Sequence, residues 1–107
     1  MATQRLDRAE WNSYFDDFSR TLIGTRRTDY AEIRVLMAEL GAQTETEWLP
    51  LTGITYDPQE DLLDIAVESL DHRISQPSDI FVEEEEGVIE AIEVITRDGT
   101  CEITELR

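Results

Sequence analysis

The sequence predicts an α+β fold: an N-terminal amphipathic helix packed on a curved, mainly antiparallel sheet of about six strands, with partial closure into a barrel as a variant. Two observations predict this class. Aromatic residues recur at helical spacing near the N-terminus, and apolar residues occupy alternate positions in several later segments. At 107 residues the chain is long enough to bury one core, so we expect a single domain over residues 1–107.

The helix is predicted over residues 7–23. Asp7 and Glu10 have the spacing of a capping box, and Gly24 is a typical residue at a helix C-terminus. The apolar stripe of the helix consists of Trp11, Tyr14, Phe15, Phe18 and Leu22. We expect this stripe to be buried against the sheet rather than to stack on a ligand.

The centre of the sheet is a predicted hairpin with strands over 47–56 and 62–69. Apolar residues alternate from Leu63 to Val67, which is the period of a half-buried strand. Asp57-Pro58 predicts the turn, because Asp can bond back to the following backbone and Pro presets the backbone φ.

The first strand of this hairpin is expected to be irregular. Pro50 has no backbone N–H, so its amide side should face an edge or a bulge. Gly53 marks the expected bulge, because the apolar pattern shifts there by one position. Trp48 is expected in the core, with an exposed apolar patch as the alternative.

Further strands are predicted over 31–38, 79–85, 88–96 and 100–106. The strand over 88–96 is apolar on both faces, so we expect both faces to be covered. Asp98-Gly99 predicts a two-residue hairpin turn, which would place Val94 opposite Ile103.

Three segments are expected to be connections: 25–29, which contains the pair Arg26-Arg27, 41–43, and 70–78. The predicted core consists of Trp11, Phe15, Phe18, Leu22, Ile33, Val35, Ile54, Leu63, Ile65, Val67, Phe81, Ile92, Val94 and Ile103.

The chain is strongly acidic, with a formal net charge of −16, and all nine basic residues are Arg. High-GC coding and salt adaptation of a prokaryotic source both explain Arg in place of Lys. Such a surface repels nucleic acid and anionic membranes, which leaves basic proteins or cations as partners, or no role for the charge beyond solubility. Cys101 is the lone cysteine and the N-terminus has no apolar run, so we expect a cytoplasmic protein.

The sequence also resembles a known family. The segments that carry the resemblance run nearly end to end and lie at Trp11–Arg20, Glu47–Pro58, Asp71–Pro77 and Asp98-Gly99. They resemble an uncharacterised prokaryotic family, domain of unknown function 5335. The resemblance implies a small stand-alone domain and supplies neither an activity nor catalytic residues.

No catalytic, cofactor-binding or metal-binding residues are predicted. The single His72 and the single Cys101 are not brought together by the predicted strands, as a nucleophile and its base would have to be. The acidic turn after Asp57 lacks the glycine of a calcium loop, because Leu62 stands at the sixth position. The acidic run 83–86 is expected to be a solvated strand end that holds cations loosely at most.

The leading hypothesis is a non-enzymatic protein-interaction module that binds a protein partner or a second copy through a strand edge or the Trp48-Pro50 region. An acidic mimic of nucleic acid is the alternative, with carboxylates at Glu83, Glu85, Glu90, Glu93, Glu102 and Glu105. A small enzyme or a weak cation-binding protein is the second alternative. The candidate binding surface consists of Trp48, Pro50, Gly53, His72 and Arg73.

Overall fold

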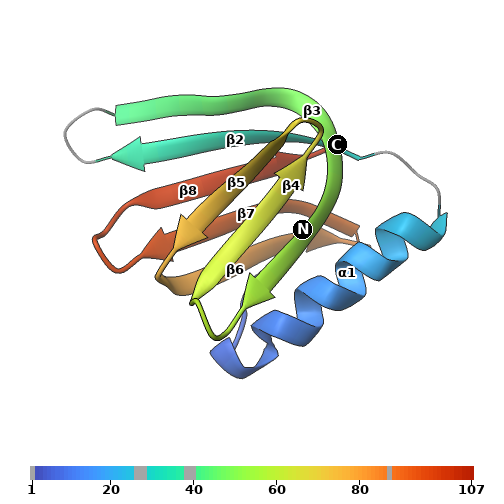
Figure 1. Cartoon of the computed structure of the whole chain (residues 1–107), viewed down its shortest axis with the longest axis horizontal. Helices are drawn as coiled ribbons and strands as arrows, with labels where there is room; N and C mark the ends of the chain where they lie inside the picture. The colour runs from blue at the N-terminus through green and yellow to red at the C-terminus, as the bar shows by residue number, and fades with distance from the viewer. Residues whose placement is uncertain (1, 26–28, 38–40, 87) are drawn as a thin grey trace.

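A computed structural model of the chain describes residues 2–25, 29–37, 41–86 and 88–107 (Figure 1). Within them, a short 3-10 turn η1 (Arg8–Glu10) leads into one helix, α1 (Trp11–Thr25). The strands are β1 (Ala2–Arg5), β2 (Tyr30–Met37), β3 (Gly41–Asp57), β4 (Leu62–Val67), β5 (Leu70–Ser75), β6 (Pro77–Glu85), β7 (Val88–Thr96) and β8 (Cys101–Leu106). They form one open antiparallel sheet in the order β1-β6-β7-β8-β2-β3-β4-β5, so the α+β class is confirmed.

The described part of the sheet has eight strands rather than the six expected, and its edge strands β1 and β5 do not pair to close a barrel. β1 and β5 are the two additional strands. The prediction of a connection over 70–78 was therefore wrong, because β5 pairs along its whole length with β4. The sequence of β5 contains two apolar residues, Leu70 and Ile74, and of these only Ile74 is buried. The segment therefore lacks the regular apolar alternation from which a strand is predicted.

β3 is the element that shapes the sheet. Its 17 residues pair first with β2, as far as Pro50, and then with β4, from Leu51 onward. The strand curves strongly between these two parts, which brings the β4–β5 hairpin over the rest of the sheet (Figure 1). Pro50 lies at this corner, where it needs no N–H for a ladder. The register slips between Leu51 and Gly53, which confirms the predicted bulge.

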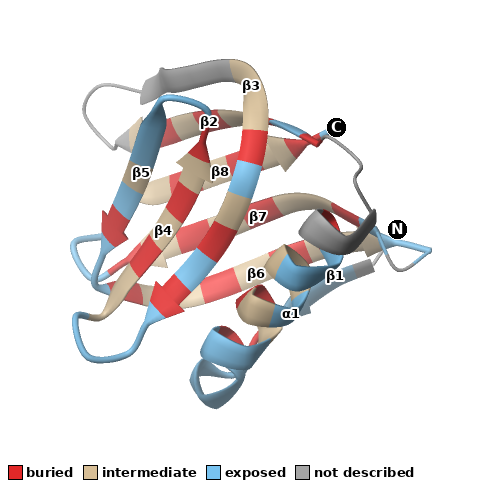
Figure 2. Ribbon diagram, turned by 45° about the vertical axis from the view of Figure 1, so that its right-hand side comes forward, coloured by how far each residue is buried: buried red, intermediate tan, exposed pale blue. Residues whose placement is uncertain are grey.

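The core lies between the β4–β5 hairpin and the inner face of β2, β6, β7 and β8, and α1 contributes its apolar stripe to it. Buried residues alternate with half-buried ones along β4 and β8 (Figure 2). Eleven of the predicted core residues are buried, and Phe18 is partly buried against them. The prediction was wrong for Phe81 and Ile103, which are half-buried on the opposite face of the sheet.

The β7–β8 hairpin explains the error at Ile103. Thr96 and Thr100 pair across a three-residue connection, through a 2.9 Å bond from Thr96 N to Thr100 O, and Gly99 has a φ of 88°. Ile103 therefore lies opposite Glu93, one position away from the predicted Val94. A slip of one residue moves every side chain of a strand to the other face.

α1 closes the free edge of the second half of β3. The Ser19 hydroxyl donates to the Ile54 carbonyl oxygen at 2.7 Å and accepts from the Ile54 amide at 2.8 Å. An added Cβ on Gly53 would lie 3.4 Å from the Ser19 oxygen, which is an ordinary van der Waals contact. The helix thus satisfies backbone groups that would otherwise form an exposed edge.

Several smaller predictions also need correction. Asp7 makes no capping bond with its side chain; its carbonyl oxygen accepts from the Glu10 amide instead, and α1 begins only at Trp11. The helix continues past residue 23 to Thr25. Segment 41–43 belongs to β3 rather than to a turn.

β7 is buried on one face and half-buried on the other, so the expectation that both faces are covered was wrong. The Arg26-Arg27 pair and position 38 lie outside the described residues. No helix in the described ranges has the length and apolar character that crossing a membrane requires.

Candidate functional site

The structure distributes the five residues of the predicted binding surface over different environments. Pro50 and Gly53 lie at the corner of β3, and Gly53 faces Ser19 of the helix. Trp48 is half-buried beneath the Arg107 guanidinium, whose carbon lies 3.8 Å from the ring centroid. His72 and Arg73 are neighbours in β5, so they face opposite sides of the sheet.

Arg73 lies on the outer side of the β4–β5 hairpin. There it lines a shallow cavity of about 560 Å³ together with Asp64 of β4 and Asp57 at the end of β3. Burial and the charge of Asp71 raise the pKa of Asp64, and one oxygen of this carboxyl, Oδ1, is buried with no hydrogen-bond partner among the described residues. Arg73 and His72 therefore line different cavities on opposite sides of β5.

His72 points into the molecule, toward β8. One of its ring nitrogens, Nε2, lies 2.5 Å from Oε1 of Glu102, and the two side chains are only 14% and 11% exposed. The pair lines a second cavity, of about 380 Å³, between β5 and the β7–β8 hairpin. Cys101 faces the other side of β8, so the single cysteine and the single histidine lie on opposite faces of the strand.

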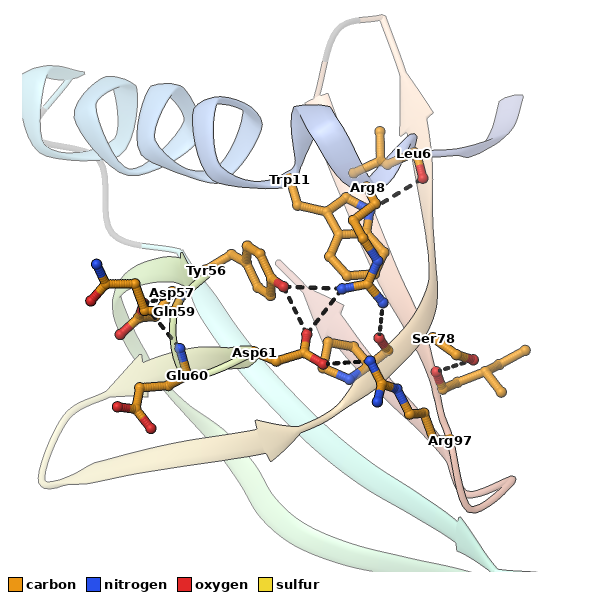
Figure 3. A network of polar contacts seen from close by, with 12 residues as sticks. Leu6, Arg8, Trp11, Tyr56, Asp57, Gln59, Glu60, Asp61, Ser78 and Arg97 are labelled. Carbon is orange, nitrogen blue, oxygen red and sulfur yellow. Dashed lines mark hydrogen bonds and ion pairs between the residues drawn. The ribbon is translucent and has the colours of Figure 1, made fainter.

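A network of polar contacts fastens the N-terminal segment to the β3–β4 turn (Figure 3). The Arg8 guanidinium donates to Asp61 Oδ1 at 3.0 Å, to the Tyr56 hydroxyl at 3.2 Å and to the Pro77 carbonyl oxygen at 2.7 Å. It also stacks on Trp11, with 4.3 Å from its carbon to the ring centroid. The Tyr56 hydroxyl donates to Asp61 Oδ1 at 2.7 Å.

The same carboxylate holds the β7–β8 hairpin. Arg97 donates to Asp61 Oδ2 at 3.1 Å, and the backbone amide of Arg97 donates to the Gln76 carbonyl oxygen. Burial opposes ionisation of Asp61, but the bonds from Tyr56 and Arg8 and the charges of Arg8 and Arg97 lower its pKa overall. We call Arg8, Tyr56, Asp61 and Arg97 the Asp61 network. Because its members bond to one another, we assign it a structural role.

The strands β6, β7, β8 and β2 present a continuous outer face. Three cross-strand rows of four half-buried side chains cover it, and we call these twelve residues the outer sheet face. The rows are Asp79, Ile95, Cys101 and Leu36; Phe81, Glu93, Ile103 and Arg34; and Glu83, Ala91, Glu105 and Glu32.

Apolar and acidic side chains are intermixed on the outer sheet face. Ile95, Cys101 and Leu36 are adjacent in one row, and Ile103 follows Cys101 two positions along β8. Glu93 lies among them, with Oε1 3.5 Å from the Cys101 sulfur. Burial, together with the Glu93 carboxylate, raises the pKa of the Cys101 thiol to about 11, so this cysteine is a poor nucleophile.

Sequence reasoning missed two features of these sites. It placed Glu102 in an exposed acidic row, whereas Glu102 is 8% exposed on the inner face of β8. It also placed Phe81 and Ile103 in the core rather than on the outer sheet face. The errors at Glu102 and Ile103 of β8 have one cause: the β7–β8 connection has three residues and not the two predicted. Gly99 was the signal for this, because three-residue hairpin connections often place a glycine in the left-handed region.

Comparisons with known proteins give one family and one relative. A family model described as a family of unknown function, DUF5335, matches residues 2–107. A protein of Aquifex aeolicus (strain VF5), described as uncharacterized, is 38% identical over 108 residues, which cover 100% of this chain and 94% of that protein. No solved structure matches the chain. Neither description attaches a chemistry to the residues above.

Proposed function

The chain belongs to the DUF5335 family, a family of unknown function, and on this premise we propose that it is a non-enzymatic protein-interaction module. The observation that carries the proposal is the outer sheet face. Its partner is a basic protein whose contact surface combines apolar residues with Arg or Lys.

The apolar part of the outer sheet face supports a protein partner. Phe81, Ile95 and Ile103 are large side chains on a sheet face that α1 leaves uncovered, because α1 packs along β3 (Figure 1). Antiparallel sheets with one solvated face usually carry polar residues there. Grouped apolar residues with a polar surround are typical of binding surfaces.

The charge of the outer sheet face supports a basic partner. Among its twelve residues are five carboxylates and a single arginine, Arg34, which already pairs with Glu32 and Glu105. Oppositely charged surfaces attract each other at long range and select against partners of the same sign. A second copy of the chain also has a net charge of −16, so self-association through this face is disfavoured.

The nucleic-acid mimic is less well supported. Glu102, one of its expected carboxylates, is turned inward to His72, and Ala91 lies between Glu83 and Glu105 while Ile103 lies opposite Glu93. A mimic of a phosphate backbone requires a row of exposed charges without apolar residues between them. The apolar residues therefore favour an ordinary protein interface.

Affinity capture from a cell extract tests the proposal with two matched variants. Ile103→Asp changes the centre of the outer sheet face, and Val88→Asp changes an apolar residue that is 44% exposed at the beginning of β7. We expect a basic partner that binds the wild-type protein and the Val88→Asp variant equally, and the Ile103→Asp variant at least about tenfold more weakly. Thermal melts establish that each variant is folded.

Three outcomes would contradict the proposal. One is a partner that binds the Ile103→Asp variant as tightly as the wild-type protein. Another is a partner that duplex DNA displaces and that tolerates Ile103→Ser, which would establish the nucleic-acid mimic. The third is a concentration-dependent dimer that Ile103→Asp abolishes, because a second copy would then occupy the face.

We propose that the partner is met in the cytoplasm, where the lone Cys101 is expected to stay reduced.

A further inference from the structure

We propose that the cavity between β5 and the β7–β8 hairpin binds a small organic cation, an ammonium or guanidinium group, through Glu102 and His72. This site lies on the inner side of β8 and is separate from the outer sheet face. It stands or falls independently of the proposed interaction module.

Glu102 lies on the inner face of the sheet, where most of the buried side chains are apolar. It lies between Val94 of β7 and Val35 of β2, and only 8% of it is exposed. Placing a carboxylate among valines is unfavourable unless hydrogen bonds or an opposite charge compensate for the lost water. The residue therefore needs partners that an aliphatic side chain in its place would not need.

The chain supplies only part of that compensation. Among the described residues, the hydrogen bond of Glu102 is the one between its Oε1 and His72 Nε2. A carboxylate can accept about four hydrogen bonds. The second oxygen of Glu102 and the second ring nitrogen of His72 have no partner in these segments, and neither atom is sealed from the cavity.

The lining of the cavity is polar. Ser75, Gln76, Thr96 and Thr100 surround the His72–Glu102 pair, and Val35 is the apolar residue among the lining side chains. The volume of about 380 Å³ suits a compact ligand rather than a chain segment.

The charges around the cavity favour a cation over an anion. Glu102 and Asp98 bring two carboxylates, whereas the one arginine in the lining, Arg97, is held by Asp61 at 3.1 Å. Asp98 is itself engaged, since its Oδ1 accepts from the Thr96 hydroxyl at 2.5 Å and the Thr100 amide at 3.0 Å. Both bonds go to Oδ1, so each of the two carboxylates keeps one oxygen for a ligand, and Glu102 is the buried one of the two.

The donor set favours an organic cation over a metal ion. No group of three or more His, Cys, Asp or Glu side chains with metal-binding geometry occurs in the described ranges. Structural and catalytic sites for zinc use at least three protein ligands. An ammonium or guanidinium group needs fewer acceptors, and it can use the free Glu102 oxygen together with the hydroxyl groups of the lining.

The test follows the ring signals of His72 by NMR, which are unambiguous because the chain has a single histidine. Butylammonium and methylguanidinium are titrated into the wild-type protein at constant ionic strength, and 1-butanol serves as the neutral counterpart of butylammonium. We expect a saturable shift of the His72 signals with at least one of the two cations and no saturable shift with 1-butanol.

Two variants separate this site from general attraction of cations to an acidic protein. Glu102→Gln removes the charge in the cavity, and Glu60→Gln removes one from an exposed turn. We expect Glu102→Gln to weaken binding at least about tenfold and Glu60→Gln to leave it unchanged. Equal weakening by both variants, or no saturable shift with either cation, would overturn the proposal. If Glu102→Gln does not fold, equal shifts with butylammonium and 1-butanol in the wild-type protein would overturn it.

Discussion

Asp61 is a residue on which side-chain contacts from three segments of the chain converge. It adopts a φ of 51° in the β3–β4 turn, and its carboxylate receives bonds from Arg8, Tyr56 and Arg97. Three segments distant in sequence are joined through one side chain that is 21% exposed. Bonds to a partly buried charge stabilise more than those between neutral groups, so we expect Asp61 to matter more than other acidic residues of the surface.

Asp61→Asn should lower the free energy of unfolding by about 1–3 kcal/mol at pH 7, because Arg8 and Arg97 lose their charged acceptor. Urea unfolding measures the change. The control is Asp17→Asn, whose carboxylate is 69% exposed and pairs with Arg20, and which should change stability by less than about 0.5 kcal/mol. Equal losses in the two variants would contradict the role of the Asp61 network.

The same comparison has a defined pH dependence. Folding lowers the pKa of Asp61 below its ordinary value of 3.8, so its contribution is fully present above pH 3.8 and is lost as pH falls through the folded-state pKa. The stability difference between the wild-type protein and Asp61→Asn should therefore be constant from pH 7 to pH 4 and should narrow below that. If the stability difference between the two proteins grew on acidification, folding would raise the pKa of Asp61 instead of lowering it.

The β7–β8 hairpin is the element whose local geometry has the widest effect. Its three-residue connection places Gly99 in the left-handed region and turns Glu102 inward and Ile103 outward. Both proposed sites depend on this register, since one uses Glu102 and the other Ile103. A two-residue connection would exchange the faces of the entire strand.

Gly99→Ala should destabilise the protein by about 1–2 kcal/mol, because an L-residue with a Cβ is strained at a φ of 88°. An added Cβ would meet no atom within 4 Å, so the loss would come from the backbone conformation alone. Gly99→Asn should cost less, because Asn tolerates this region better. Urea unfolding should therefore rank the wild-type protein as the most stable, then Gly99→Asn, then Gly99→Ala. An alanine variant as stable as the wild-type protein would contradict the proposed strain at position 99.

Charge is the dominant property of the molecule as a whole. With a net charge of −16 on 107 residues, the carboxylates repel one another in the compact folded state. The ion pairs of Arg5, Arg8, Arg34 and Arg97 offset only part of this repulsion. The same charge selects basic partners and opposes self-association. We therefore expect salt to act in opposite directions on folding and on partner binding.

The melting temperature should rise as NaCl increases from 20 mM to 1 M, because the Debye length falls from tens of ångströms to about 3 Å and the repulsion is screened. The matched variant replaces three exposed acids, Glu60, Glu68 and Glu86, with Gln. It should melt higher than the wild-type protein at 20 mM NaCl and at nearly the same temperature at 1 M. A wild-type melting temperature that falls with salt would mean that ion pairs outweigh the repulsion.

The sequence by itself determined the helix stripe, the alternation that marks the interior strands, and the irregular corner of β3 at Pro50 and Gly53. These features could be predicted because they depend on local properties: a 3.6- or 2-residue period, a missing N–H and a missing Cβ. Eleven buried core residues followed from the same patterns. Local chemistry of this kind is carried by each segment and does not depend on which strand lies beside it.

Only the tertiary structure decided which side of β8 faces inward and that β1 and β5 are strands. The edge strands have little apolar alternation of their own, and they are strands because β6 and β4 offer them backbone partners. The inward face of β8 depends on one residue in the β7–β8 connection, and through it Glu102 meets His72. The contacts that define both candidate sites arise from pairing between segments, and the periodicity of a single segment does not specify that pairing.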